Sequence, residues 1–120
     1  MRPTAYLVVQ GSSVIAWWVL LATVHSSRAW FFPGGDISPE LHALLLPDVI
    51  VLGVMSLAAA WGRSTRRPWA APVSWLVAGG TSYAALFTFH WSLQVGAPVL
   101  SPALMGLLAA GSIVSALQPL

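Results

Sequence analysis

Few side chains in this sequence are suited to acid–base or ligand chemistry. The three histidines and the three acids fall at positions 25–48 and 90, namely His25, Asp36, Glu40, His42, Asp48 and His90. Imidazoles can bind a metal ion or haem iron, and a neighbouring carboxylate can exchange a proton or hold a cation. No two histidines are three or four residues apart, and no cysteine is present. The spacing therefore predicts no metal site and no cofactor, although His25 and His90 could be paired axial ligands of a haem.

These residues are set between long apolar blocks. Hydrophobic residues make up 58% of the 120 residues and charged ones 7%, against about a quarter charged in a soluble domain. The blocks show no strand-like alternation, so helices in lipid are favoured over a barrel. We predict an all-α integral membrane four-helix bundle in a single domain, residues 1–120. Its spans are expected at about 6–24, 38–61, 72–93 and 101–117, and the first is too long for a signal-peptide core and is interpreted as a retained helix.

The arginines predict how the bundle is oriented. Arg2 precedes the first span and three arginines follow the second, whereas Arg28 alone lies in the first loop. Since basic loops stay in the cytoplasm, both termini are expected to be cytoplasmic, in a multi-pass protein of the inner (plasma) membrane. Aromatic residues near the expected ends of the spans are typical of the membrane interface: Trp30, Phe31, Phe32, Trp61 and Trp69.

This orientation places every histidine and acid in the outer half of the bundle. Tyr83, His90 and Gln94 share one helical face of the third span, and Trp18 and His25 share one of the first. If both faces point inward, they predict an outward-opening polar pocket floored by Trp18 and Tyr83. The alternative is that these polar residues simply lie in loops and at helix ends. The candidate ligand-binding residues are His25, Arg28, His42, Asp48, Tyr83, His90 and Gln94.

Asp48 is the residue whose position matters most. The triplet Ser38-Pro39-Glu40 is typical of a helix start, and Pro47 would then kink the second span. In that case Asp48 is buried and needs a partner, for which Arg28, His25 and His90 are candidates. If the span instead begins at Pro47, Asp48 is a first-turn carboxylate at a helix N-terminus. The sequence leaves both interpretations open.

Small residues form two further patterns. The third span carries a stripe of them, and Gly111 and Ser115 form a small-xxx-small pair in the fourth. Such patterns allow close helix packing, within the bundle or between copies of it. The stripe consists of Ser74, Ala78, Thr81, Ala85 and Thr88.

Three short motifs carry a resemblance to a known family. Arg28-x-Trp30-Phe31-x-Pro33, Leu46-Pro47-Asp48 and the Arg-Arg-Pro-Trp turn at 66–69 resemble the N-terminal membrane segment of bacterial isoprenylcysteine-methyltransferase-like proteins. The catalytic, cofactor-binding half of that family has no counterpart in these 120 residues. The resemblance therefore implies a membrane fold and transfers no activity and no catalytic residue.

Three functions follow from these patterns. The first is a non-enzymatic membrane module or subunit, in contact with lipid and with a second copy or a membrane partner protein, and without nucleic acid. The second is a small transporter or ligand-binding bundle that uses the pocket around Asp48. The third is a membrane enzyme or haem or metal protein that uses His25 and His90.

Overall fold

The computed structural model describes residues 2–120, including every side chain in that range but that of Leu41. The described chain is all-α, with no strand among these residues. In chain order the elements are α1 (Pro3–Thr23), η1 (His25–Trp30), η2 (Pro33–Gly35), α2 (Pro39–His42), α3 (Leu45–Pro47), η3 (Asp48–Val54), α4 (Met55–Ser64), α5 (Ala70–Val95) and α6 (Leu100–Leu117).

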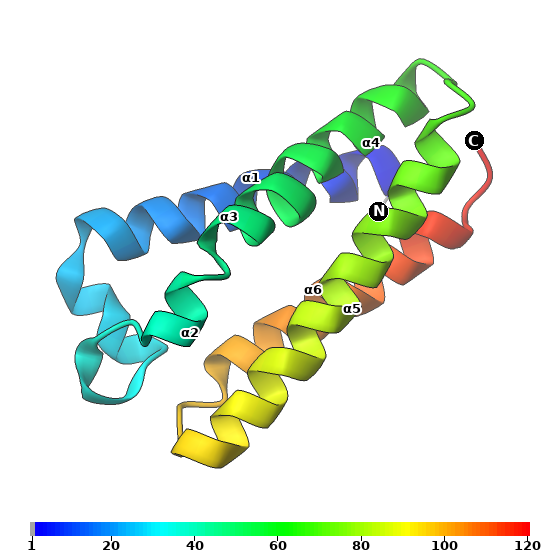
Figure 1. Ribbon diagram of the computed structural model, residues 1–120. Coiled ribbons are helices and arrows are strands. Elements are labelled where there is room, and N and C mark those ends of the chain that lie inside the picture. The colour runs from blue at the N-terminus through cyan, green and yellow to red at the C-terminus, as the bar shows by residue number, and fades with distance from the viewer. Residues whose placement is uncertain (1) are drawn as a thin grey trace.

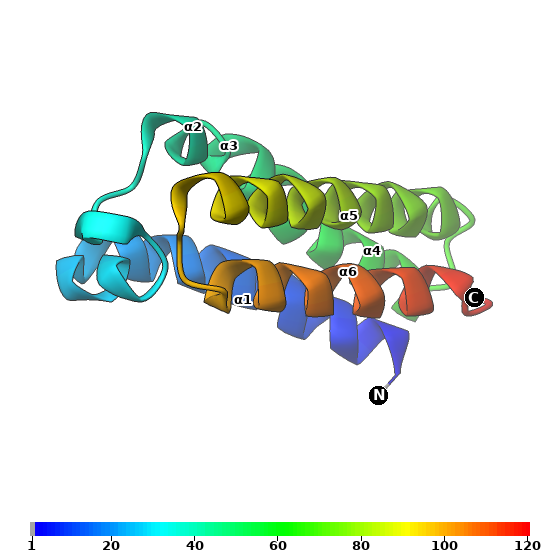
Figure 2. The ribbon, with the colours of Figure 1, turned by 90° about the horizontal axis from the view of Figure 1, so that it is seen from below.

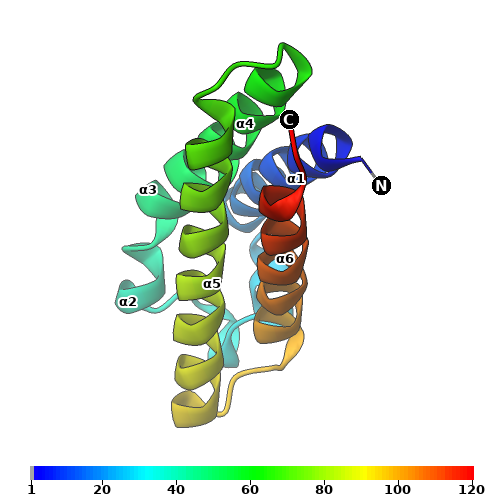
Figure 3. The same cartoon turned by 90° about the vertical axis from the view of Figure 1, so that its right-hand side faces the viewer.

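Four long helical segments run back and forth: α1, the continuous run α3–η3–α4, α5 and α6 (Figure 1). The run α3–η3–α4 packs against α1, and α6 packs against α5. Both termini and the α4–α5 turn lie at one end of the molecule (Figure 1), and the η1–η2 loop and the α5–α6 turn lie towards the other (Figure 2). The two pairs cross where α1 meets α6 and diverge towards the loop end, as Figure 3 also shows.

Three helical segments are long and apolar enough to cross a membrane: Pro3–Thr23, Leu45–Ser64 and Leu100–Leu117. The fourth predicted span, α5, has 26 residues but is not among them. Serine, threonine, glycine and histidine in its sequence lower its mean hydropathy. The helical architecture is thus confirmed, and membrane-spanning character is supported for three of the four segments.

The second segment begins later than its capping triplet predicts. Residues 39–42 form a short separate helix, and the long helix starts at Leu45. Pro47 is therefore in the first turn, where its missing N–H has no helical acceptor to lose. The kink predicted near Pro47 is found as a break in the helix at residues 43–44, three to four residues before the proline. From Asp48 to Val54 the helix is wound as a π-helix, a form often found at functional sites.

Close packing of α1 depends on small residues. A Cβ atom at Gly11 would lie 2.7 Å from the carbonyl oxygen of Gly53, so these helices touch backbone to backbone. A Cβ atom at Gly111 would overlap the ring of Tyr6, which lies across α6. Four residues of the predicted stripe on α5 are buried inside the bundle, which supports packing within one chain: Ser74, Ala78, Thr81 and Thr88.

A buried polar network ties α1, α4 and α6 together. Gln10 is 1% exposed, and its Nε2 donates to Ser56 Oγ at 3.0 Å. Its Oε1 accepts from Ser112 Oγ at 2.7 Å and from the Tyr6 hydroxyl at 2.8 Å. The Ser56 hydroxyl in turn donates a hydrogen bond to the Leu52 carbonyl. Because all these groups find partners, the network fixes the register of three helices at low cost.

Candidate functional site

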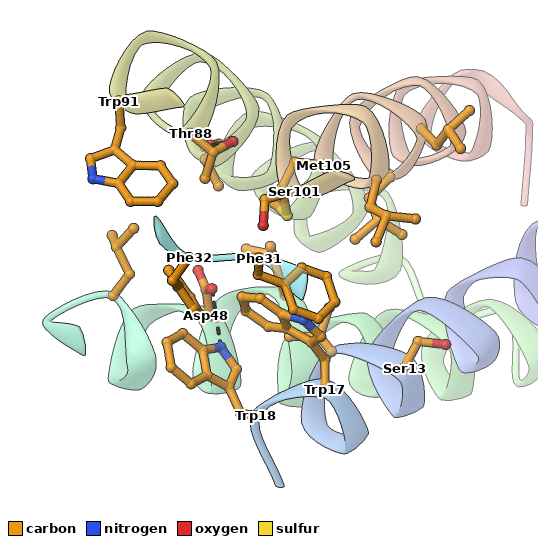
Figure 4. A pocket seen from close by; sticks show the side chains of 17 residues that line it. Ser13, Trp17, Trp18, Phe31, Phe32, Asp48, Thr88, Trp91, Ser101 and Met105 are labelled. Atoms are coloured by element: carbon orange, nitrogen blue, oxygen red, sulfur yellow. Dashed lines mark hydrogen bonds between the residues drawn. The ribbon is translucent and has the colours of Figure 1, made fainter. Parts of the chain in front are cut away.

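A cavity of about 390 Å³ lies between the diverging helix pairs, at the loop end of the molecule (Figure 4). This volume is within the range of small-molecule sites, roughly 300–1,000 Å³. Side chains from α1, the η1–η2 loop, η3, α5 and α6 line it. The lining residues are Ser13, Val14, Trp17, Trp18, Phe31, Phe32, Leu44, Asp48, Leu52, Ala84, Thr88, Trp91, Ser101, Leu104, Met105, Leu107 and Leu108.

Aromatic rings form a continuous part of this wall. Trp17 packs edge-on against Trp18 with centroids 4.9 Å apart, and against Phe31 at 5.4 Å. Phe31 lies beside Phe32, which contacts Trp91 of α5 at 5.9 Å. These edge-to-face contacts stabilise the wall beyond simple burial. The chain of rings connects α1 to α5 through the loop and so holds the loop over the end of the cavity.

Asp48 is the one ionisable residue among those that line the cavity. It is 7% exposed, and its Oδ2 accepts a 3.1 Å hydrogen bond from the indole Nε1 of Trp18. That is the one hydrogen bond of its side chain within residues 2–120. The carboxylate points into the cavity between the aromatic rings (Figure 4). A carboxylate in such apolar surroundings is stabilised by a further donor or a cation.

Two other polar atoms at the cavity have no partner. The indole Nε1 of Trp17 and the hydroxyl of Ser101 are buried without a hydrogen bond in the described chain. Ser101 is 6% exposed, and both residues line the cavity. Unpaired buried groups each cost about 1–3 kcal/mol. The cavity therefore offers a bound molecule one strong acceptor, and two unpaired polar groups lie buried in its wall.

The cavity opens sideways between α1 and α6. Ser13 on α1 and Leu107 on α6 both line it and are both exposed on the outside of the bundle. Leu104 is likewise exposed, at 42%. The helices meet near Tyr6 and Gly111 and separate beyond that point, so the opening follows from their crossing.

The predicted pocket face of α5 is wrong. Tyr83 is 70% exposed, and His90 and Gln94 on the same face are exposed too. None of the three lines the cavity. The helix α5 turns its other face to the core: Thr88 and Trp91 point inward, and Tyr83 and His90 point away from the core.

The other candidates lie around the loop rather than in the cavity. His25 in η1 and His42 in α2 are exposed, and neither His25 nor His90, the candidate imidazole partners of Asp48, lines the cavity. Arg28 donates from Nε to the Leu21 carbonyl at 2.8 Å, which caps the end of α1. Its 3.9 Å ion pair with Asp36, whose side chain is 90% exposed, contributes little to the stability of the fold. No group of three metal-ligating side chains occurs among residues 2–120.

Asp48 combines a feature of each interpretation that the sequence left open, the buried carboxylate and the first-turn carboxylate at a helix start. The helix starts close to Pro47, as one of them requires, yet the carboxylate is buried, as the other requires. Its partner is Trp18, which the sequence had assigned to the floor of the pocket, and none of the three expected cations. Trp18 itself is 6% exposed and lines the cavity as predicted.

Sequence reasoning missed most of the aromatic wall. Phe31 and Phe32, expected at the membrane interface, are 5% and 2% exposed and belong to the core. Trp91 is three residues beyond the buried Thr88, so the small-residue stripe of α5 already marked its face.

Comparison with known proteins found no matching family model, no matching curated protein and no matching solved structure.

Proposed function

We propose that the chain is a four-helix membrane protein with both termini on the cytoplasmic side. Three segments have the length and hydropathy of membrane spans, and α5 packs beside them with the length to cross as well. Arg2, Arg63, Arg66 and Arg67 gather at the end with the termini, and Asp36, Glu40 and Asp48 lie towards the other. This charge distribution supports the cytoplasmic, inner-membrane assignment. The resemblance to methyltransferase-like membrane segments stays a prediction.

We further propose that this bundle is a non-enzymatic binding module for a lipophilic amine. The observation that carries this proposal is the buried Asp48 carboxylate in an aromatic cavity of about 390 Å³. An ammonium head would donate to the carboxylate and lie against the aromatic rings, where cation–π attraction adds to binding. An alkyl or aryl body would fill the apolar remainder and enter from the bilayer through the opening between α1 and α6.

Binding is favoured over catalysis by the chemistry of the lining. Asp48 has no second ionisable group beside it in the cavity, so an acid–base pair is missing from the residues that line it. The histidines, which would be needed for haem or proton transfer, are exposed elsewhere. The transporter alternative would use the same carboxylate and the same ligand, with movement of the helices added.

The test is a titration with octylamine of the purified protein in phosphatidylcholine nanodiscs, followed by tryptophan fluorescence. Trp17, Trp18 and Trp91 line the cavity, so occupation changes their emission. Asp48→Asn keeps the size and the acceptor for Trp18 but removes the charge. We expect it to weaken octylamine binding about tenfold to a hundredfold, the range for one charge-assisted hydrogen bond.

Asp36→Asn is the matched control, because the same charge is removed from a side chain that is 90% exposed. Its affinity for octylamine should equal that of the unmodified protein. Octanol, which has the same chain and no charge, should bind more weakly and be insensitive to Asp48→Asn. Equal octylamine affinities of the Asp48→Asn and Asp36→Asn proteins would refute the proposal, and stronger binding of octanol would assign the site to a hydroxyl ligand instead.

A further inference from the structure

A second pocket lies at the opposite end of the molecule, where the termini meet the α4–α5 turn. Its volume is about 340 Å³, and three of its lining residues are arginines, one from the N-terminus and two from the end of α4 and the turn after it. Arg2 precedes α1, Arg63 lies on the last turn of α4, and Arg66 is in the turn that follows. The lining residues are Arg2, Pro3, Thr4, Arg63, Ser64, Arg66, Pro119 and Leu120.

No acidic side chain lies at this pocket, and the terminal carboxyl group of Leu120, which lines it, forms no ion pair with an arginine in the described chain. All three acidic residues lie at positions 36–48, away from this end. The one ion pair among residues 2–120 joins Arg28 to Asp36, near the loop. Several guanidinium groups close together repel each other unless an anion lies between them.

Arg63 is an unusual member of this group because its side chain is buried, with 7% exposure. Its Nε donates to Ser74 Oγ at 2.9 Å, and its Nη1 donates to the Gln118 carbonyl at 3.1 Å. These two bonds fix the guanidinium, while its Nη2 is buried without a partner. Because a buried charged donor without a partner is costly, an acceptor placed beside the Arg63 Nη2 would stabilise the guanidinium.

The start of α1 contributes to the same pocket. Its first bond within the described residues runs from the Tyr6 N–H to the Arg2 carbonyl, so the N–H group of Thr4 has no acceptor within the described part of the helix. The Thr4 side chain lines the pocket, which sets the positive end of a 21-residue helix beside the arginines. Helix N-termini and guanidinium groups both favour phosphate oxygens.

We infer that this pocket binds a phosphate group, with Arg63 as the fixed donor and Arg2 and Arg66 as mobile ones. The phosphate belongs to an anionic phospholipid headgroup or to a free phosphate. A phospholipid phosphodiester places two non-bridging acceptor oxygens among the guanidinium groups, and a free phosphate places more. The site is independent of Asp48, so its failure would not affect the amine-binding proposal.

The test is a calorimetric titration of the protein in nonionic micelles with three probes. These are dihexanoyl-phosphatidylglycerol, the corresponding phosphatidylcholine and inorganic phosphate. We expect saturable one-to-one binding of the phosphatidylglycerol and weaker or no binding of the phosphatidylcholine. Saturation by inorganic phosphate with equal or higher affinity would assign the site to free phosphate, and saturation by phosphatidylglycerol alone would assign it to lipid.

Arg66→Gln and Arg67→Gln are the matched pair of variants. Both side chains are exposed neighbours in one turn, but Arg66 lines the pocket and Arg67 does not. We expect Arg66→Gln to weaken binding about tenfold or more, as for the loss of one charge-assisted hydrogen bond, and Arg67→Gln to change it by less than about threefold. Equal weakening by the two variants, or no saturable binding of either phosphate probe, would overturn the inference.

Discussion

Trp17 and Trp18 are adjacent in sequence but differ in one hydrogen bond, and this difference gives a sharp prediction. The indole of Trp18 donates to Asp48 at 3.1 Å, whereas the indole of Trp17 has no partner. Both rings line the cavity. Replacing either residue by phenylalanine removes the same atoms next to the same cavity, so part of the cost of lost packing cancels between the two variants, although Trp18 is the more buried.

The difference between the variants follows from the hydrogen bond. A bond to a charged acceptor contributes about 1.5–3 kcal/mol in soluble proteins, and side-chain bonds in membrane proteins about 0.6 with a maximum near 1.7. We therefore expect Trp18→Phe to lower the free energy of unfolding by about 1–2 kcal/mol more than Trp17→Phe does. Trp17→Phe also removes an unpaired donor, which offsets part of its packing loss.

The assay is equilibrium unfolding of each variant in mixed micelles with increasing dodecyl sulfate, followed by circular dichroism. A double-mutant cycle of Trp18→Phe with Asp48→Ala isolates the pairwise contribution, expected at about 1 kcal/mol. Equal destabilisation by Trp17→Phe and Trp18→Phe, or a cycle in which the two effects simply add, would refute the proposed anchoring of Asp48.

Three further predictions concern the packing and orientation of the bundle. Gln10→Leu, which removes three buried hydrogen bonds, should lower the free energy of unfolding by about 2 kcal/mol in the same micelle assay, and the exposed Gln94→Leu should leave it unchanged. Gly111→Ala should cost about 1–3 kcal/mol through overlap with Tyr6, whereas Gly79→Ala, whose Cβ meets nothing within 4 Å, should be neutral or stabilising. Reporter fusions should place both termini in the cytoplasm, and a periplasmic signal from either would contradict the orientation.

The sequence predicted the helical segments because their signal is long and local. An apolar block of about 20 residues predicts a helix even when its first and last residues are uncertain by several positions. It left open whether the second span begins at Ser38 or near Pro47, since the capping triplet at Ser38 does begin a helix, but only a short one. Local capping preferences cannot say how far a helix continues.

The candidate site was predicted in part. Asp48 and Trp18 both line the cavity, but the hydrogen bond between them was not predicted, and the ligand-binding role of Asp48 stays a prediction. The wrong face of α5 was chosen because polar residues were taken to point inward. The small-residue stripe through Thr81 and Thr88 had indicated the opposite face, about half a turn from Tyr83 and His90. The packing face of α5 thus follows its small residues rather than its tyrosine and histidine.

The loop could not be predicted from periodicity at all. Phe31 and Phe32 fill the end of the cavity because the 3₁₀ turns of η1 and η2 fold the loop back against Trp17 and Trp91. Gly34 and Gly35 both have φ of 75°, a conformation in which other residues would be strained. The two glycines thus permit the turn that buries the aromatic pair.

The central claim, that a lipophilic amine binds in the cavity beside Asp48, is tested most directly by photolabelling. An alkylamine carrying a diazirine would be irradiated with the protein in nanodiscs, and the labelled residues mapped by mass spectrometry. We predict labels on lining residues such as Met105 and Leu108, suppressed by excess octylamine and lost in Asp48→Asn but retained in Asp36→Asn. Labels spread over the exposed faces of the helices, unchanged in Asp48→Asn, would contradict the claim.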